Sequence, residues 1–246
     1  MLRGKRLDLA LVDRGFFNTR HQAQVAIMAG EVQIDGRVAA KASDSVQEAN
    51  DLSVAARNRY VGRGGEKLAG ALVHFEIDPA GLVALDIGAS TGGFTDCLLQ
   101  NGARKVFAVD VGHGQLAWKI RDDPRVVTFE KLNARHLSSE QIPEPIDLCV
   151  IDVSFISLTL ILPNAFELLT PDGVILALIK PQFELARADV GRGGIVREPE
   201  LHAKAQEKIV AFAATLGARV GGLFPSTITG TDGNQEFFIC LRKPSA

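Results

Sequence analysis

The chain has 246 residues, of which 46% are hydrophobic and 23% charged, and its formal net charge at pH 7 is −2. This length fits one large domain, or a small domain joined to a medium one, with enough apolar residues for a buried core. No unbroken apolar run is longer than that of Val174–Ile179, which is far shorter than the about 20 residues that cross a bilayer, and no signal-peptide pattern is present. Three widely spaced cysteines in apolar runs (Cys97, Cys149 and Cys240) predict core thiols in a reducing compartment. We therefore expect a cytoplasmic protein.

Positive charge is concentrated in the N-terminal part. Residues 1–64 contain ten Lys/Arg and seven Asp/Glu, whereas the rest of the chain contains 17 basic and 22 acidic residues. A basic segment joined to an acidic body suggests that the segment meets a polyanion. Because random fluctuation can also produce an excess of three, the partner has to be identified from other features.

Residues 1–59 have the pattern of a small α+β module. Thr19 is a helix N-cap residue, Gly30 ends a helix, and Asp35-Gly36 is a hairpin turn signal. The pattern predicts two helices, a hairpin and a last short strand, over residues 7–15, 20–29, 31–38 and 51–54.

This module resembles the S4 domain, an RNA-binding module first seen in a small-subunit ribosomal protein. Thr19 and Asp35 depart from the Ser and Asn that are usual in that family, but they keep the capping and turn chemistry. The resemblance rests on Arg6-Leu-Asp, Leu11, Gly15, Thr19-Arg20, Ala23, Ile27, Gly30-Glu-Val, Asp35-Gly and Lys41.

The resemblance implies that a basic face binds RNA. Lys and Arg side chains supply the sequence-independent part of RNA affinity by contacting phosphates. The residues alone leave open the alternative of a solvated face with salt-bridge partners. The residues expected to contact RNA are Arg3, Lys5, Arg6, Arg20, His21, Lys41 and, just beyond the module, Arg63.

An Arg- and Gly-rich stretch without periodicity, residues 55–65, predicts a linker. We therefore expect an S4-like domain over 1–59 and a second domain over 60–246. Tyr60, the single tyrosine of the chain, can either pack at the joint or stack on a base.

Apolar runs alternate with helix-like stretches through residues 60–246, which is the pattern of an α/β fold with a mostly parallel sheet. Helices are expected over 158–169, stopped by Pro171-Asp-Gly, and after Pro199. The last two strands should form an antiparallel pair. The seven expected strands cover residues 83–87, 106–110, 126–129, 148–152, 174–180, 219–224 and 236–241.

A glycine-rich turn follows the first of these strands. It brings backbone N–H groups and a helix N-terminus toward a ligand, but Ser90 replaces the glycine that lets backbone approach a dinucleotide pyrophosphate. Ligands lie beyond the carboxyl ends of such strands, where Asp86 suits a cationic group, Asp110 ribose hydroxyls and Asn133 an adenine. The expected cofactor-binding residues are Asp86, Gly88, Ala89, Ser90, Thr91, Gly92, Gly93, Phe94, Asp110 and Asn133.

This pattern resembles the S-adenosylmethionine site of class I methyltransferases, which implies their Rossmann-like sheet, S-adenosylmethionine as cofactor and no metal. Four further segments resemble the FtsJ-type ribose 2′-O-methyltransferases. These are Arg63-Gly-Gly-Glu-Lys-Leu, Asp152-Val-Ser-Phe, Lys180-Pro-Gln-Phe-Glu and Gln235-Glu-Phe.

Together with the N-terminal module, the resemblance is closest to the TlyA (hemolysin A) family and covers nearly the whole chain. It implies ribosomal RNA or a ribosomal subunit as partner and a cytidine 2′-hydroxyl as acceptor, with the large subunit favoured. The fourth strand end lacks the Asn/Asp-Pro-Pro-Tyr/Phe motif of amino-group methylases, and no cysteine lies in an exposed loop suited to cytosine C5 methylation.

The same resemblance assigns catalysis to Lys67, Asp152, Lys180 and Glu236. A ribose 2′-hydroxyl is a poor nucleophile at neutral pH, so alignment of hydroxyl, methyl and sulfur supplies the main part of the rate. We expect Lys180 to contact the hydroxyl and the other three residues to position it.

Two further segments are expected to border the acceptor. Residues 183–198 contain Arg187, Arg192 and Arg197 and predict either a mobile RNA-facing loop or a disordered insertion. Residues 226–234 are rich in Thr and Gly and predict a loop beside the acceptor pocket.

Three other functions stay open at this point. The chain could be an RNA-binding ribosome-assembly factor without catalysis, a methyltransferase that acts on a base, or a membrane-active hemolysin. The last lacks a strongly basic amphipathic helix. The modified nucleotide and the oligomeric state are not indicated.

Overall fold

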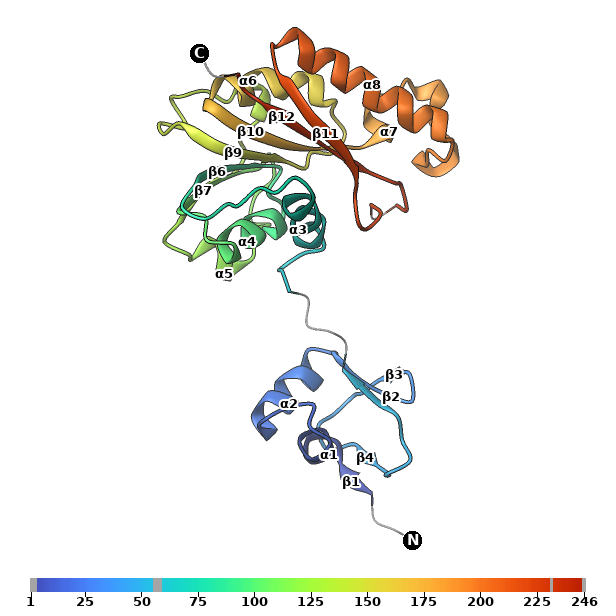
Figure 1. Ribbon diagram of the computed structural model, residues 1–246. Helices are drawn as coiled ribbons and strands as arrows, with labels where there is room; N and C mark the ends of the chain where they lie inside the picture. Colours follow the sequence, from blue (N-terminus) through green and yellow to red (C-terminus); the bar gives the residue numbers. More distant parts are fainter. Residues whose placement is uncertain (1–3, 55–58, 231, 245–246) are drawn as a thin grey trace. The chain divides into compact units, whose positions relative to one another are not determined.

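Residues 4–54, 59–230 and 232–244 are described by the computed structural model (Figure 1). Contacts divide the chain into two compact units, Met1–Asn58 and Arg59–Ala246, called here the N-terminal and the C-terminal unit. Each unit has a hydrophobic core of its own. The assignment of residues 1–59 and 60–246 as two functional domains remains a prediction.

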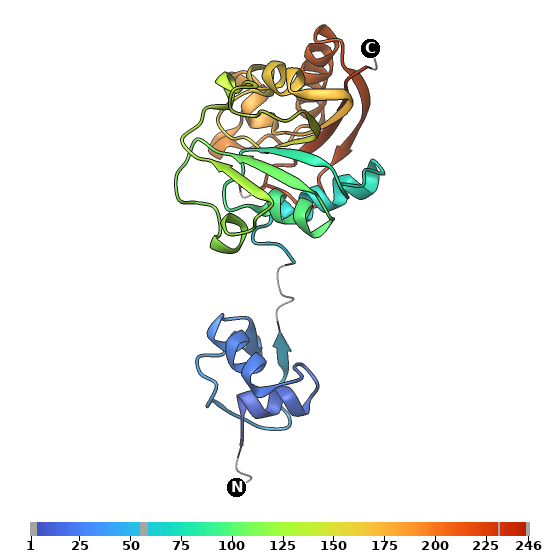
Figure 2. The same cartoon turned by 90° about the vertical axis from the view of Figure 1, so that its left-hand side faces the viewer.

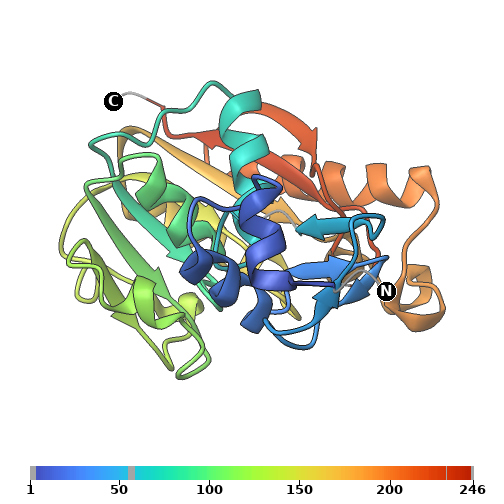
Figure 3. The same ribbon diagram turned by 90° about the horizontal axis from the view of Figure 1, so that it is seen from below.

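The N-terminal unit contains two helices that lie beside a hairpin (Figure 3). The Thr19 hydroxyl accepts a hydrogen bond from the Gln22 N–H at 3.2 Å, which confirms the predicted N-cap. Asp35 and Gly36 have φ angles of 50° and 78°, as a two-residue hairpin turn requires. The elements are β1 (Lys5–Arg6), α1 (Leu7–Asp13), α2 (Arg20–Met28), β2 (Val32–Ile34), β3 (Arg37–Val38), β4 (Ser45–Val46) and β5 (Leu52–Val54).

Two short sheets complete the N-terminal unit. One has the strand order β3-β2-β5, and the other pairs β1 with β4, all antiparallel. The helices, the hairpin and the last strand confirm the predicted pattern. The pair β1–β4 was not predicted, because strands of two residues carry no periodicity.

A buried carboxylate joins the parts of the N-terminal unit. Asp8 of α1 is fully buried and accepts hydrogen bonds of 2.8–3.1 Å from Arg6 of β1 and from Arg20 and Gln24 of α2. The Arg6 guanidinium is the main reason why the pKa of this carboxyl lies well below its ordinary value. One side chain therefore ties three elements together.

The C-terminal unit is built on a seven-stranded sheet with the order β11-β12-β10-β9-β6-β7-β8. Neighbouring strands from β10 to β8 are parallel, whereas β12 is antiparallel to both β10 and β11. This confirms the predicted mostly parallel sheet and its antiparallel last pair. The strands are β6 (Val83–Ile87), β7 (Lys105–Val109), β8 (Val126–Phe129), β9 (Ile146–Ile151), β10 (Leu169–Ile179), β11 (Arg219–Pro225) and β12 (Phe237–Arg242).

Helices cover both faces of the sheet (Figures 1 and 2). One face packs against α3 (Gly64–His74), α4 (Gly93–Gln100) and α5 (Trp118–Arg121), and the other against α6 (Leu162–Glu167) and α8 (Pro199–Thr215). The strands in the middle are buried on both sides, which explains their nearly continuous apolar sequences. The short helices are η1 (Ala134–His136), η2 (Leu158–Leu160), α7 (Pro181–Glu184), η3 (Arg187–Asp189) and η4 (Arg192–Gly194).

The helix predicted over 158–169 was wrong in its extent and in its stop. Pro163 has no N–H to donate and is tolerated only in a first helical turn, so α6 begins at Leu162 after a separate turn of η2. Pro171-Asp-Gly lies inside β10, where the register against β9 shifts and Asp172 has a φ of 65°. The predicted helix stop is therefore a bulge in a strand.

We expect Asp8→Ala to destabilise the N-terminal unit by about 1–3 kcal/mol, because it removes hydrogen bonds from a buried carboxylate to two guanidinium groups. Amide hydrogen exchange of peptides from α1 and α2 in the full chain measures this change. Asp13→Ala is the matched control, since Asp13 lies on the same helix and makes an exposed ion pair with Lys5. Equal exchange in the two variants would contradict the role of Asp8.

The same carboxylate predicts a pH dependence. Its pKa is depressed in the folded state, so its contribution to stability is present above the unfolded pKa of about 4 and is lost as the pH falls further. Relative to the intrinsic exchange rate at each pH, exchange in α1 and α2 should therefore accelerate below about pH 4 in the wild type. Asp8→Asn, which cannot titrate, should not show this additional acceleration.

Candidate active site

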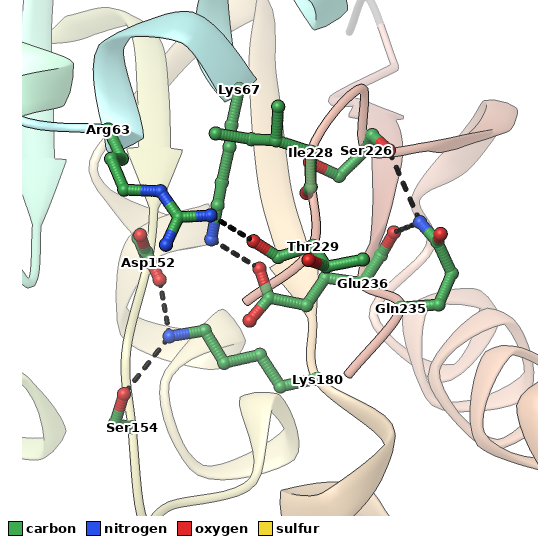
Figure 4. Close-up of polar contacts among 10 residues, drawn as sticks. All are labelled: Arg63, Lys67, Asp152, Ser154, Lys180, Ser226, Ile228, Thr229, Gln235 and Glu236. Carbon is green, nitrogen blue, oxygen red and sulfur yellow. Dashed lines mark hydrogen bonds and ion pairs between the residues drawn. The ribbon is translucent and has the colours of Figure 1, made fainter. Parts of the chain in front are cut away.

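The four residues expected to act in catalysis lie together at the carboxyl edge of the sheet (Figure 4). Lys67 projects from α3, Asp152 directly follows β9 and Lys180 directly follows β10. Glu236 directly precedes β12, whose first residue pairs with the last residue of β10. The antiparallel last strand therefore brings the fourth residue to the edge at which the parallel strands end.

Two lysine–carboxylate ion pairs form this cluster. Lys67 Nζ lies 2.5 Å from Glu236 Oε2, and Lys180 Nζ lies 2.6 Å from Asp152 Oδ1. Lys180 also donates a hydrogen bond to Ser154 Oγ at 3.0 Å. Lys67, Glu236 and Lys180 are only 3–9% exposed, whereas the Asp152 side chain is 21% exposed. The Lys180–Asp152 pair is therefore more accessible to a substrate than the Lys67–Glu236 pair.

A loop over residues 226–230 closes the cluster on one side (Figure 4). Arg63, which precedes α3, donates a hydrogen bond to the Thr229 carbonyl at 3.1 Å. A side chain on Gly230 would come within 2.5 Å of Glu236 Oε1. The loop therefore lies against the Lys67–Glu236 pair, as expected for a segment that borders the site.

The glycine-rich turn approaches the end of β9 closely. Gly88 has a φ of +89°, and a Cβ atom there would lie 2.2 Å from the Asp152 carbonyl oxygen. Ser90 has a φ of 48°, which is uncommon for a residue other than glycine, and Gly92 at φ +95° is the N-cap of α4. These conformations place the turn beside Asp152.

Two cavities open along this turn. The larger has a volume of about 330 Å³, and the smaller, of about 110 Å³, is lined by Gly64, Phe94 and residues of the turn. Gly88, Ser90 and Asp152 line both cavities. The larger cavity is further lined by Ile87, Val109, Asp110, Val111, Gln115, Leu132, Asn133, Ala134, Val153, Ser154, Phe155, Ile156 and Ile161.

Asp110 and Asn133 lie in the wall of the larger cavity; Asp110 directly follows β7, and Asn133 comes four residues after β8. Asp110 accepts hydrogen bonds from the Ser90 N–H at 2.7 Å and the Gly112 N–H at 2.6 Å, so it also shapes the turn. The Asn133 side chain caps η1 by accepting from the Arg135 N–H at 3.1 Å. Asp110 and Asn133 therefore both stabilise the local backbone and line the larger cavity.

Asp86 lies beneath the turn and lines neither cavity. Its Oδ2 accepts a hydrogen bond from the Thr95 hydroxyl at 2.6 Å, whereas its buried Oδ1 has no hydrogen-bond partner among the described residues. Burial raises the pKa of Asp86 to about 7, helped by the charges of Asp152 and Asp110 and opposed by the Thr95 hydrogen bond. Because Asp86 is buried and lines neither cavity, its carboxylate can act on a bound cationic group only through its charge.

The residues expected to contact RNA differ in their ion-pair partners and in the unit to which they belong. Arg6 and Arg20 are both held by Asp8, yet their side chains remain 45% and 52% exposed. Lys5 is paired with Asp13, and Arg63 belongs to the C-terminal unit. Arg3 lies outside the described residues. His21 and Lys41 are exposed.

The segment 183–198, for which we predicted a mobile RNA-facing loop or a disordered insertion, has short turns and contacts with a second loop. It contains η3 and η4, and buried Val196 donates its N–H to Asn234 Oδ1 at 2.9 Å. The Asn234 side chain also donates to the Gly194 carbonyl at 2.9 Å. One buried amide thus joins this segment to the loop before Glu236. The arginines Arg187, Arg192 and Arg197 are exposed.

Sequence reasoning did not single out Ser154 or the apolar wall of the larger cavity. Ser154 could have been found from its place two residues after a strand-end aspartate. Val111 and Leu132 carry no such signal, because single apolar residues in loops are common.

The cysteines are buried and free, as predicted. Within the described ranges no helix has the length and apolar character needed to span a membrane.

Two family models match the chain. The model described as FtsJ-like methyltransferase matches residues 60–243, and the model described as S4 domain matches residues 5–52. The chain is 46% identical over 244 residues to the 16S/23S rRNA (cytidine-2′-O)-methyltransferase TlyA of Mycobacterium tuberculosis, covering 98% of this chain and 91% of that protein.

Solved structures agree with these matches. A hemolysin from Streptococcus thermophilus is 42% identical with a TM-score of 0.76, covering 100% of this chain and 90% of that chain. An S-adenosylmethionine-dependent methyltransferase from Mesorhizobium loti shares the fold at 14% identity, with a TM-score of 0.55 and coverage of 74% and 100%. The chain therefore belongs to the TlyA family of FtsJ-like methyltransferases and carries an N-terminal S4 domain.

Proposed function

We propose that the protein transfers a methyl group from S-adenosylmethionine to a ribose 2′-hydroxyl of ribosomal RNA, with cytidine as the modified nucleoside. The observation that carries this proposal is the ion pair between Lys180 and Asp152, because Asp152 lines both cavities and the more buried Lys67–Glu236 pair belongs to the same cluster. The S4 domain and the activity named for the Mycobacterium tuberculosis relative support ribosomal RNA as the substrate. Such a substrate implies action in the cytoplasm.

The cavities fit the cofactor. Asp110 and Asn133 would hold its nucleoside in the larger cavity, and the turn from Gly88 to Phe94 would hold the methionine part in the smaller one. Asp86 lines neither cavity, so it would act on the cationic amino group through its charge, from beneath the turn; its Oδ1 has no hydrogen-bond partner among the described residues. When bound, S-adenosylmethionine supplies an electrophilic methyl group on a sulfonium.

Lys180 is the residue that we assign to the nucleophile. Its ammonium group, held by Asp152 and Ser154, has a third donor position with which it can orient the 2′-hydroxyl oxygen. Asp152 lines the cavities and is the nearest acceptor for the hydroxyl proton. Lys67 and Glu236 neutralise each other and form the buried part of the cluster. Alignment of oxygen, methyl and sulfur then contributes most of the acceleration.

The main competing function is an RNA-binding assembly factor without catalysis. It would use the S4 domain and the exposed arginines of 183–198 in the same way. Burying ion pairs costs free energy, and RNA binding alone gives no reason to bury two of them beside a cavity. Substitution of Lys180 separates the two functions.

We expect Lys180→Ala to lower the rate of methyl transfer to unmodified ribosomal subunits by about 100-fold or more, because the hydroxyl loses its orienting group. The affinities for the subunit and for S-adenosylmethionine should change by less than about threefold. Lys204→Ala, which removes an exposed lysine paired with Asp189, is the control and should retain wild-type activity. Undiminished transfer by Lys180→Ala would refute the assignment.

The Lys67–Glu236 pair predicts a non-additive effect on stability. Lys67→Met or Glu236→Gln alone should each cost about 3–5 kcal/mol of unfolding free energy, because each leaves a buried charge without its partner. The double variant should cost less than the sum of the two. Urea unfolding of the four proteins measures the coupling, and strict additivity would show that the two side chains do not depend on each other.

Binding of S-adenosylmethionine should depend on the titration of Asp86. The pKa of Asp86 is about 7 in the free protein, and a cationic ligand favours the charged form. The affinity should therefore fall by up to about tenfold for each pH unit below 7. Asp86→Asn removes this titration and reports the ligand's own ionisation. Calorimetry that finds the same pH dependence in both proteins would exclude Asp86 as the partner of the amino group.

A further inference from the structure

We propose that Glu184 is a positioning residue of this site, which holds the segment after β9 against the segment after β10 and so fixes Asp152 and Lys180 relative to each other. This inference rests on the proposed function. Glu184 lines neither of the two cavities. Its effect on the reaction must therefore pass through the two segments that it joins.

The Glu184 carboxylate is buried and fully engaged. It is 5% exposed and lies at the end of α7. Its Oε2 accepts hydrogen bonds from Ser157 Oγ at 2.5 Å and from Lys208 Nζ at 3.0 Å, and its Oε1 accepts from the Leu158 N–H at 2.8 Å. Each carboxylate oxygen therefore accepts a hydrogen bond from the segment that follows β9: Oε2 from Ser157 and Oε1 from Leu158.

The same two segments meet a second time at the catalytic pair. Lys180, four positions before Glu184, contacts Asp152 and Ser154. Between these two connections the rings of Phe155 and Phe183 lie with their centroids 5.0 Å apart. Segments 152–158 and 180–184 are thus joined at both ends and in the middle, with the catalytic contact at one end and Glu184 at the other.

Lys208 connects this assembly to the body of the unit. Its Nζ donates to the Glu184 carbonyl at 2.6 Å as well as to the carboxylate, and lies 3.3 Å from Ser157 Oγ. Lys208 belongs to α8, which buries Ala205 and Ile209 in the core. The helix therefore supplies a rigid support for the end of the two segments that is remote from the cofactor.

The segment after β9 needs such support because its backbone is strained. Phe155 has a φ of 64°, a left-handed conformation that costs a bulky residue about 1–3 kcal/mol and persists only when neighbouring contacts enforce it. The Leu158 N–H bound to Glu184 is a backbone anchor three residues further on. Without this anchor, residues 153–157 are free to relax and to carry Asp152 and Ser154 away from Lys180.

We expect Glu184→Ala to lower the single-turnover rate of methyl transfer by about 10- to 100-fold at saturating RNA and S-adenosylmethionine, because small displacements of reacting groups have effects of this size. The affinities for both ligands should stay within about threefold. Amide exchange of peptides covering 153–158 should accelerate. Lys208→Met should act in the same direction, and Lys208→Arg, which keeps a cation on Glu184, should recover most of the rate.

Asp189→Asn is the matched control, because Asp189 is a carboxylate on a neighbouring turn that pairs with Lys204 of the same helix. It should leave rate and exchange unchanged. A wild-type rate in folded Glu184→Ala, a loss that saturating ligand restores, or unchanged exchange in 153–158 would each overturn the positioning role. If the wild type transfers no methyl to ribosomal RNA, the proposed function fails, while exchange still decides whether Glu184 holds the segment.

Discussion

Two lysines remain nearly buried at the carboxyl edge of the sheet because each meets a carboxylate. An unpaired ammonium there would cost several kcal/mol, so Lys67 depends on Glu236 and Lys180 on Asp152. These partners come from α3, β9, β10 and the start of β12, which are far apart in the sequence. Lys180 meets Asp152 because β9 and β10 are parallel neighbours, and Glu236 reaches the same edge because β12 runs antiparallel beside β10. The topology of the last strands is therefore a condition for the chemistry of the site.

The segment after β9 connects the parts of the site. Its first residue, Asp152, lies against the glycine-rich turn, where Gly88 leaves no room for a Cβ atom, and it lines both cavities. The same residue pairs with Lys180, and Glu184 and α8 hold the far end of the segment. Residues 152–158 thus contact the glycine-rich turn, Lys180 and α8. These contacts are the reason why we propose that Lys208, although distant, influences the reaction.

Much of the fold could be predicted because local signals agree with it. Strands ending in a charged residue, the Thr19 cap and the Asp35-Gly36 turn each have a short-range physical cause. The resemblance singled out four residues that the structure brings together in one cluster, and their catalytic role stays a prediction. Which lysine pairs with which carboxylate is decided by strand order, which a sequence alone does not reveal. Asp8 and Glu184 belong to segments that carry the resemblance, but their burial was not predicted. A single acidic residue on a helix is usually solvated, and its burial depends on distant partners. Pro163 carried a usable signal, since proline belongs in a first helical turn.

We propose that this edge of the sheet methylates a ribose hydroxyl of ribosomal RNA. The most direct test incubates the full chain and labelled S-adenosylmethionine with unmodified ribosomal subunits, then hydrolyses the RNA with alkali and maps resistant linkages by mass. A 2′-O-methyl group removes the hydroxyl that alkaline cleavage requires. The account predicts a labelled, alkali-resistant linkage at a cytidine. Label that is transferred without any resistant linkage would place the methyl on a base or a protein and would contradict the account.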